Sequence, residues 1–326
     1  MILRRTLLAA APAAALALPA LTRPAQAAEP SADLKVRGSK AYSESAMVMT
    51  MSLDNQSAMT LRFCRFPVQG QTWLWVHILH EGRFYAFTSH DLPCTTDRLA
   101  SAPLAEYRTA PLKAELVRVR RPGALPAVRL SAELMFHESR AAPHGPGKVP
   151  GKITAQFLAV SPLDSKVLEG REEIYGFCDG EVEIAGHRFK LNGLAKYHEQ
   201  RQEAPRFEQP FNYSWLAGDS ANATTLLIAD QAGGGWQLDG REKALADMTV
   251  DLPGDDRRVV WKYKDGSADN GRLKALVRYE IPIYGTRRWH GSFVKGDGPG
   301  REVVGVMNDF LGEPDIYAAA RARAGA

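Results

Sequence analysis

Short apolar runs, separated by turn-forming residues, recur along almost the whole of this 326-residue chain. Alternation of apolar and polar residues with a period of two is typical of a half-buried β-strand, whereas an amphipathic helix needs a period near 3.6. In the first half, the expected strands are 46–53, 59–66, 72–79, 83–89, 114–119, 127–136 and 153–160. His80-Glu81-Gly82 is expected to form a tight connection between two of them.

The second half repeats this pattern. Strands are expected at 180–184 and 187–195 on either side of a turn at Ala185-Gly186, and then at 224–229, 243–250, 259–263, 273–281 and 301–308. Long amphipathic helices are almost absent; residues 314–323 form either a short helix or a frayed tail. The chain is therefore predicted to be all-β, with two successive antiparallel β-barrel or sandwich domains and very little helix. We expect an N-terminal domain at 28–163, a linker at 164–171 and a C-terminal domain at 172–326.

Residues 1–27 have the pattern of a cleaved export signal. Arg4 and Arg5 precede an Ala/Leu-rich stretch at 6–21, and Ala25-Gln26-Ala27 provides a small-x-small cleavage site. The apolar stretch is shorter than the roughly 20 residues that a membrane-spanning helix needs. The paired arginines favour a twin-arginine signal over an ordinary secretory one. We therefore expect a periplasmic or secreted protein with no transmembrane segment in the mature chain.

Charge and cysteine content exclude several classes of partner and site. The leader carries three arginines and no acid, so its removal lowers the formal charge from +4 to +1, which gives no basis for nucleic-acid binding. Cys64, Cys94 and Cys178 allow at most one internal disulfide, and the spacing does not select a pair. The alternative for each cysteine is a small buried apolar residue. The histidines and cysteines lack a convincing metal-ligand spacing, so no metal is expected.

An aromatic stripe follows the expected strand 72–79. Strand alternation places Trp73, Trp75 and His77 on one face and the intervening aliphatic residues on the other. Such a wall either lines a cavity for a flat or isoprenoid-like ligand or belongs to an ordinary aromatic core.

A dense polar cluster follows the expected strand 187–195. It comprises the five consecutive residues Tyr197, His198, Glu199, Gln200 and Arg201. Adjacent His198 and Glu199 are candidates for a catalytic base and its neighbour at the mouth of a barrel. The alternative is a solvated loop.

Aromatic residues and a carboxylate follow this cluster. Tyr213 and Trp215 supply aromatic bulk, and Asp230 closes the apolar strand 224–229. A carboxylate in this position is either a turn former before the glycines 233–235 or a general acid whose pKa is raised by an apolar setting.

From Gly180 to Asp230 the chain resembles the carotenoid 1,2-hydratase (hydroxyneurosporene synthase) superfamily, which includes AttH-like secreted proteins. The resemblance is carried by a hairpin leading to Gly193-x-x-x-Tyr197-His198-Glu199, an aromatic stretch, and an apolar strand that ends in Asp230. It implies two lipocalin-like domains with a hydrophobic pocket, His198 as the motif histidine and Asp230 as the proton donor to a carbon–carbon double bond. Gln200 stands where the family hydratases have Trp, and Ile228 where they have Tyr.

The function implied by this resemblance is that of an exported lyase or isomerase without a cofactor. The enzyme would protonate or hydrate a double bond of a hydrophobic, isoprenoid-like or polycyclic molecule, and aromatic faces would stabilise a carbocation. The expected catalytic residues are Asp230, His198 and Glu199. The expected substrate-binding residues are Trp73, Trp75, His77, Tyr197, Gln200, Tyr213 and Trp215. The alternative function is a non-catalytic periplasmic carrier of lipids or isoprenoids that uses the same pocket.

Overall fold

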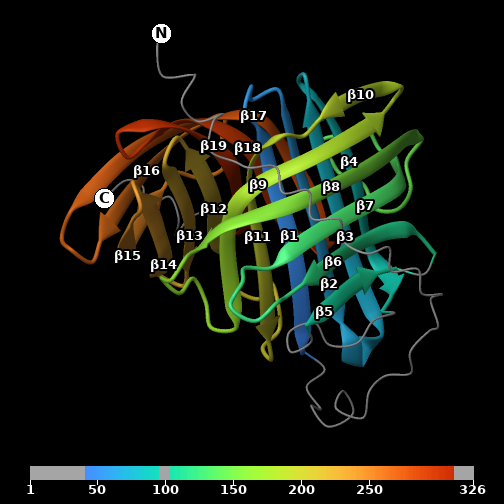
Figure 1. The fold of residues 1–326 in the computed structure, drawn as a ribbon, viewed down its shortest axis with the longest axis horizontal. Helices are drawn as coiled ribbons and strands as arrows, with labels where there is room; N and C mark the ends of the chain where they lie inside the picture. Colours follow the sequence, from blue (N-terminus) through green and yellow to red (C-terminus); the bar gives the residue numbers. More distant parts are fainter. Residues whose placement is uncertain (1–40, 95–102, 110, 312–326) are drawn as a thin grey trace.

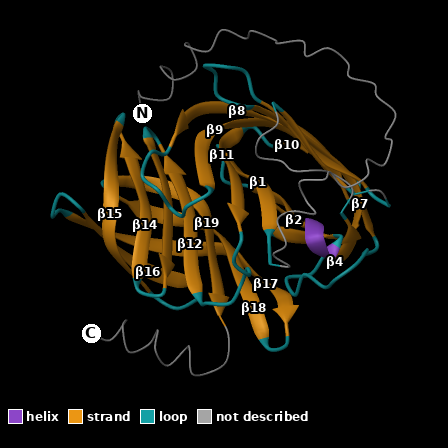
Figure 2. Ribbon diagram, turned by 90° about the horizontal axis from the view of Figure 1, so that it is seen from below, coloured by secondary structure: helices purple, strands orange, loops and turns teal. Residues whose placement is uncertain are grey.

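The computed structural model describes residues 41–94, 103–109 and 111–311. This part of the chain consists of strands β1 to β19 and one turn of 3-10 helix, η3 (Pro67–Gln69), which is purple in Figure 2. The predicted all-β class is therefore confirmed. The export signal at 1–27 and the short helix or tail at 314–323 lie outside the described residues.

The first half of the molecule is a curled antiparallel sheet (Figure 1). Its strands follow the order β4-β3-β2-β1-β11-β9-β8-β7-β6-β5, and β10 pairs with β9 beside this path. The strands are β1 (Ser43–Ser52), β2 (Ser57–Phe66), β3 (Gln71–His80), β4 (Arg83–Pro93), β5 (Leu104–Arg108), β6 (Lys113–Val119), β7 (Ala127–Phe136), β8 (Val149–Pro162), β9 (Arg171–Ile184), β10 (His187–Lys190) and β11 (Gly193–Gln202).

The second half is a closed barrel of eight strands, drawn in brown to red in Figure 1. Its strands are β12 (Phe211–Gly218), β13 (Ala221–Ile228), β14 (Gln231–Leu238), β15 (Arg241–Val250), β16 (Asp256–Tyr263), β17 (Ala268–Tyr284), β18 (Arg287–Gly298) and β19 (Arg301–Leu311). The barrel closes where β12 pairs with β19, so Phe211 lies opposite Phe310. Closure removes the free edges that an open sheet would leave.

The boundary between the two halves lies later in the chain than the sequence predicts. The expected linker at 164–171 connects β8 to β9, which pair with each other within the first sheet. β11 then returns to pair with β1, with Gln202 opposite Ser43. The connection between sheet and barrel is therefore the segment 203–210. β1 and β11 are separated in the chain by most of the first half of the molecule. Local periodicity cannot predict a pairing between strands so far apart.

Three hydrophobic cores hold these layers together. The first fills the curl of the sheet, the second lies between the other face of the sheet and the outside of the barrel, and the third fills the barrel. Trp73, Trp75 and His77 face the second core, whereas Leu74 and Val76 face the first, as strand alternation predicts.

A glycine in the barrel permits one close approach between strands. A Cβ atom on Gly305 would lie 2.0 Å from the backbone oxygen of Trp215, an atom that cannot move without disturbing the β12–β19 pairing. We expect Gly305→Ala to lower the free energy of unfolding by about 1–3 kcal/mol. Gly254→Ala is the control, because the nearest atom to its Cβ would lie 3.7 Å away. Urea unfolding of both variants measures the difference, and equal stability would contradict this account of the barrel.

Buried histidines make the folded state sensitive to acid. Burial lowers the pKa of His77 to about 3, and burial together with His144 and Arg62 lowers that of His90 to about 3. An unfolded chain binds protons at these residues below about pH 6.5, where the folded state does not. We therefore expect the free energy of unfolding to fall as the pH is lowered from 7 to 5, with each histidine contributing up to about 1.4 kcal/mol per pH unit.

His77→Phe isolates one of these contributions. The His77 ring stacks on Phe84 and lies 4.6 Å from Tyr279, and neither ring nitrogen has a hydrogen-bond partner among the described residues. Phenylalanine preserves the ring packing and removes the titrating group. Urea unfolding at pH 5, 6 and 7 is expected to give a shallower pH dependence for the variant. An unchanged slope would show that His77 takes up protons in the folded state.

Candidate functional site

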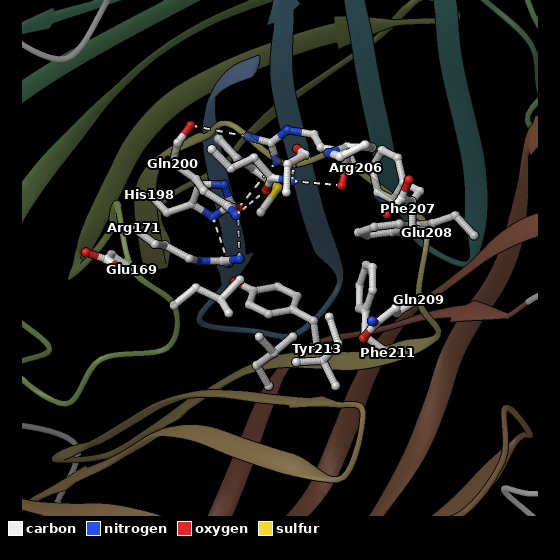
Figure 3. A pocket seen from close by; sticks show the side chains of 18 of the residues that line it. Glu169, Arg171, His198, Gln200, Arg206, Phe207, Glu208, Gln209, Phe211 and Tyr213 are labelled. Carbon is white, nitrogen blue, oxygen red and sulfur yellow. Dashed lines mark hydrogen bonds between the residues drawn. The ribbon is translucent and has the colours of Figure 1, made fainter. Parts of the chain in front are cut away.

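A pocket of about 380 Å³ lies between the curled sheet and the barrel (Figure 3). This volume falls within the range of about 300–1,000 Å³ that is typical of small-molecule sites. The pocket is lined by residues of β1, β2, β9, β11, the connection 203–210, β12, β13 and β18, with a contribution from the β8–β9 connection. The lining residues are Met47, Arg62, Leu168, Glu169, Arg171, His198, Gln200, Gln202, Ala204, Pro205, Arg206, Phe207, Glu208, Gln209, Phe211, Tyr213, Leu226, Ile228 and Trp289.

The polar cluster predicted at 197–201 is part of strand β11, which continues to Gln202. Its side chains therefore alternate between two faces. His198 and Gln200 line the pocket, whereas Tyr197 belongs to the core inside the sheet. Glu199 accepts hydrogen bonds from Tyr197 Oη at 2.5 Å and from Arg118 Nε at 2.8 Å. The expected partnership of His198 with Glu199 is wrong, because the strand places them on opposite faces.

His198 lines the pocket and has one ring nitrogen without a partner among the described residues. Its side chain is buried, and Nη2 of Arg171 donates to Nδ1 at 3.2 Å, as the dashed lines in Figure 3 show. Burial and the neighbouring Arg171 hold the pKa of His198 well below its usual value. The imidazole is therefore neutral at neutral pH, and because Nδ1 accepts a hydrogen bond, the proton resides on Nε2. Nε2 has no hydrogen-bond partner in the described part of the chain.

Tyr213 presents a second unpartnered donor from the barrel side. Its ring belongs to the core between sheet and barrel, and its hydroxyl is buried without a hydrogen-bond partner among the described residues. The guanidinium of Arg171 lies 4.7 Å from the ring centroid, and Nζ of Lys196 lies 4.5 Å from it. Figure 3 shows Arg171 and His198 on one side of the pocket and Tyr213 and Phe211 on the other. Two residues that line the pocket, from different elements, thus each carry a buried donor without a hydrogen-bond partner among the described residues.

Positive charge exceeds negative charge in the buried part of the site. Glu173 pairs with Arg171 and accepts a hydrogen bond from Lys196 at 2.6 Å. Burial lowers the pKa of Lys196 to about 7 in spite of this ion pair. Arg206 donates to Ser43 and Gln200, which are neutral. Arg62 is 5% exposed, and no carboxylate of the described residues lies within ion-pair distance of it.

The connection 203–210 supplies an apolar wall. Phe207 is buried with a φ of 62°, a conformation that a bulky residue rarely adopts. Tyr284 and Arg287 both donate hydrogen bonds to its backbone oxygen, and so hold this conformation in place. The ring centroids of Phe207 and Trp289 lie 5.9 Å apart, and those of Phe211 and Trp289 lie 5.6 Å apart. These three rings form an aromatic wall.

The expected substrate-binding residues fall into two groups. Gln200 and Tyr213 line the pocket. The other five belong to the cores. Trp75, His77 and Trp215 are buried at the core between sheet and barrel, Trp73 is partly buried against it, and Tyr197 is buried in the core of the sheet. The guanidinium of Arg62 already lies 4.7 Å from the Trp75 ring centroid. For the aromatic stripe of β3, the structure therefore supports the ordinary-core alternative.

Asp230 lies in the exposed turn between β13 and β14. Ala229 and Asp230 have φ values of 46° and 67°, as a tight hairpin turn requires. Ile228, two residues earlier, lines the pocket, but Asp230 does not. This position provides the turn-forming role that the sequence allows, without the apolar setting that a protonated carboxylic acid needs.

Several residues of the pocket are not apparent from the sequence. Arg62, Arg171, Arg206, Phe207 and Trp289 belong to four separate segments that only the fold brings together. For one of them the sequence carries a local signal: Arg62 interrupts the apolar run of β2, where a buried charge is unusual.

Cysteines, metals and membrane spans add no further site. All three cysteines are free thiols, and Cys64 and Cys178 are buried. Within the described ranges, no group of three His, Cys, Asp or Glu residues could hold a metal ion. No helix in the same part of the chain is long and apolar enough to cross a membrane.

Comparison with known proteins reveals relatives in structure. No family model matches the chain, and no curated protein matches its sequence. An AttH-type protein of Nitrosomonas europaea aligns with a TM-score of 0.55 and 10% identity, over 82% of this chain and 92% of that one. CghA, crystallised with Sch210972, aligns with a TM-score of 0.52 and 11% identity, over 83% and 88% of the two chains. Kievitone hydratase from Nectria haematococca aligns with a TM-score of 0.48 and 10% identity, over 84% and 90%.

The alignments with the AttH-type protein and with CghA cover more than four fifths of this chain, and so include parts of both the curled sheet and the barrel. At 10–11% identity they show a shared fold and not a shared activity. The resemblance to AttH-like proteins inferred from the sequence is confirmed at this level: the chain has the fold of the AttH-like proteins, with two lipocalin-like β units side by side.

Proposed function

We propose that this protein is an exported lyase or isomerase that hydrates or isomerises a double bond of a hydrophobic small molecule in the pocket between sheet and barrel. The observation that carries this proposal is the pair of unpartnered donors, His198 Nε2–H and Tyr213 Oη–H, which lie among the described residues in one pocket with an aromatic wall. The sequence resemblance to the carotenoid hydratase superfamily supports the same class of reaction. The leader at 1–27 supports a periplasmic or secreted location.

The charges around the pocket favour a reaction that develops negative charge. Arg62, Arg171 and Arg206 all line the pocket and would repel a carbocation. The ring of Trp75, a candidate from the sequence for stabilising such a cation, faces the Arg62 guanidinium. The same cations stabilise an enolate-like transition state. We therefore assign as substrate a double bond conjugated with a carbonyl group, and not an isolated alkene.

In the proposed step, His198 Nε2–H donates a hydrogen bond to the substrate carbonyl oxygen. A neutral imidazole suits this role, since it polarises the carbonyl without losing its proton. For hydration, water adds its oxygen to the β-carbon, the π electrons move to the carbonyl oxygen, and Tyr213 Oη gives a proton to the α-carbon. The water proton then returns the tyrosine to its starting state. For isomerisation, one carbon loses a proton and another gains one. Neither reaction requires a cofactor.

Isotope labelling tests this proposal although the substrate is unidentified. The purified protein is incubated with an extract of apolar bacterial metabolites in H₂¹⁸O and, separately, in D₂O, and products are followed by mass spectrometry. Hydration incorporates ¹⁸O, and isomerisation incorporates deuterium at carbon with no other change in composition. A compound that binds the protein but is recovered chemically unchanged from both solvents would favour the alternative function of a carrier.

Three variants test the proposed catalytic roles of individual residues. Tyr213→Phe is expected to lower turnover by about 10²–10⁴-fold because it removes the proposed proton donor. His198→Gln is expected to lower turnover less, since an amide can still donate a hydrogen bond to the carbonyl. Asp230→Asn is the control, because asparagine also tolerates the positive φ of the turn. Loss of turnover in Asp230→Asn alone would restore Asp230 as the proton donor and contradict the assignment of Tyr213.

A further inference from the structure

The pocket holds positive charge that the folded chain does not neutralise. Three arginines line it: Arg62, Arg171 and Arg206. A fourth basic side chain, Lys196, does not line the pocket, but its Nζ lies 4.5 Å from the ring centroid of the lining residue Tyr213. Among the described residues, Glu173 is the one carboxylate that accepts a hydrogen bond from any of them. Glu169 and Glu208 also line the pocket, but both are exposed at its rim, where water screens their charge.

Arg62 is the clearest case of an unneutralised charge. It occupies a position within β2 where every residue is buried, and its Nε has no hydrogen-bond partner among the described residues. Its guanidinium lies against aromatic rings, 4.7 Å from the centroid of Trp75 and 5.5 Å from those of Phe207 and Trp289. Cation–π contacts of this kind replace only part of the hydration that a buried guanidinium loses.

His198 adds a neutral donor to the same pocket. It is 2% exposed, and its Nε2 is a second polar atom that is buried without a partner in the described part of the chain. Together with the guanidinium groups it offers several N–H donors and few acceptors. Such a donor-rich surface is complementary to a planar anion, which accepts from arginine in a bidentate manner.

We infer that the ligand of this pocket carries an anionic group, a carboxylate or an enolate, which binds among Arg62, Arg171, Arg206 and His198, while its apolar body lies against Phe207, Phe211 and Trp289. This inference rests on the proposed function for the identity of the site and extends it to the class of substrate. The anion neutralises arginine side chains that have no carboxylate partner among the described residues, and the aromatic wall contacts the rest of the molecule. A neutral hydrocarbon of the same size leaves Arg62 and Arg206 without a charged partner in the described part of the chain.

A pair of probes that differ only in charge tests this inference. Farnesoate and methyl farnesoate have the same isoprenoid chain and the same conjugated carbonyl group, but only the first is an anion at pH 8. Isothermal titration calorimetry on the full-length protein is expected to show at least about 10-fold tighter binding of farnesoate, as charge-assisted hydrogen bonds would give. Equal affinities, or tighter binding of the ester, would overturn the inference.

The Arg62→Met variant tests whether the anionic group binds at Arg62. Methionine fills similar space without charge, and an apolar side chain avoids the cost of burying an unpaired charge. We expect this variant to lose at least about 10-fold in affinity for farnesoate, to keep its affinity for the ester, and to unfold at an unchanged or higher temperature. Arg188→Met, which alters an exposed arginine on β10, is the matched control and is expected to bind both probes like the wild-type protein.

Binding and turnover can fail independently. Preference for the anion without isotope incorporation in any product would support this inference and contradict the proposed enzymatic function. Isotope incorporation into neutral compounds, with no preference for farnesoate, would support the enzymatic function and contradict the inference. If Arg62→Met does not fold, the comparison of the two probes on the wild-type protein still decides the question.

Discussion

Burial on both faces of the central strands is the constraint on which the rest of this structure depends. All ten residues of β1 and all ten of β2 are buried, because one face of each strand packs inside the curl of the sheet and the other packs against the barrel. Polar side chains on these two strands, and those of Lys196, His198, Glu199 and Gln200 on β11, are buried. Each must find a partner within the protein, since an unpaired buried charge is costly. The candidate site lies on the face of the sheet where some buried charges have no oppositely charged partner within the described ranges.

The two faces differ in this respect. Inside the curl, Arg65 pairs with Glu44 at 2.5 Å, and Glu199 receives hydrogen bonds from Arg118 and Tyr197, so charge is balanced. On the barrel side, Glu173 is shared by Arg171 and Lys196. The hydrogen-bond partners of Arg206 and the aromatic rings against Arg62 are neutral. A balanced network serves the fold. An unbalanced one destabilises the empty protein, and a bound anion compensates for it.

Sequence periodicity predicts the strands and their faces well, because alternation is a local property. It places Trp73, Trp75 and His77 on one face correctly, yet does not show that this face packs against the barrel. The same rule of alternation separates His198 from Glu199 once the cluster at 197–201 is part of a strand, whereas the sequence alone favours a cluster beyond the strand end. Local periodicity does not predict which strands pair when they are far apart in the chain. The return of β11 to β1 moves the boundary to 203–210 and brings Arg62 and His198 into one pocket, on either side of Met47 of β1.

The connection 203–210 links the fold to the chemistry. It contributes Arg206 to the cationic end of the pocket and Phe207 to the aromatic wall, and the positive φ of Phe207 turns this ring inward. Tyr284 and Arg287 of the barrel donate hydrogen bonds to the Phe207 carbonyl. Arg206, the preceding residue, donates to Ser43 of the sheet, so both halves of the molecule hold this connection. The relative position of sheet and barrel therefore sets the distance between the cations and the apolar wall. A ligand whose charge and apolar body match that distance binds with least reorganisation, and this geometry selects among substrates more strictly than the apolar wall alone.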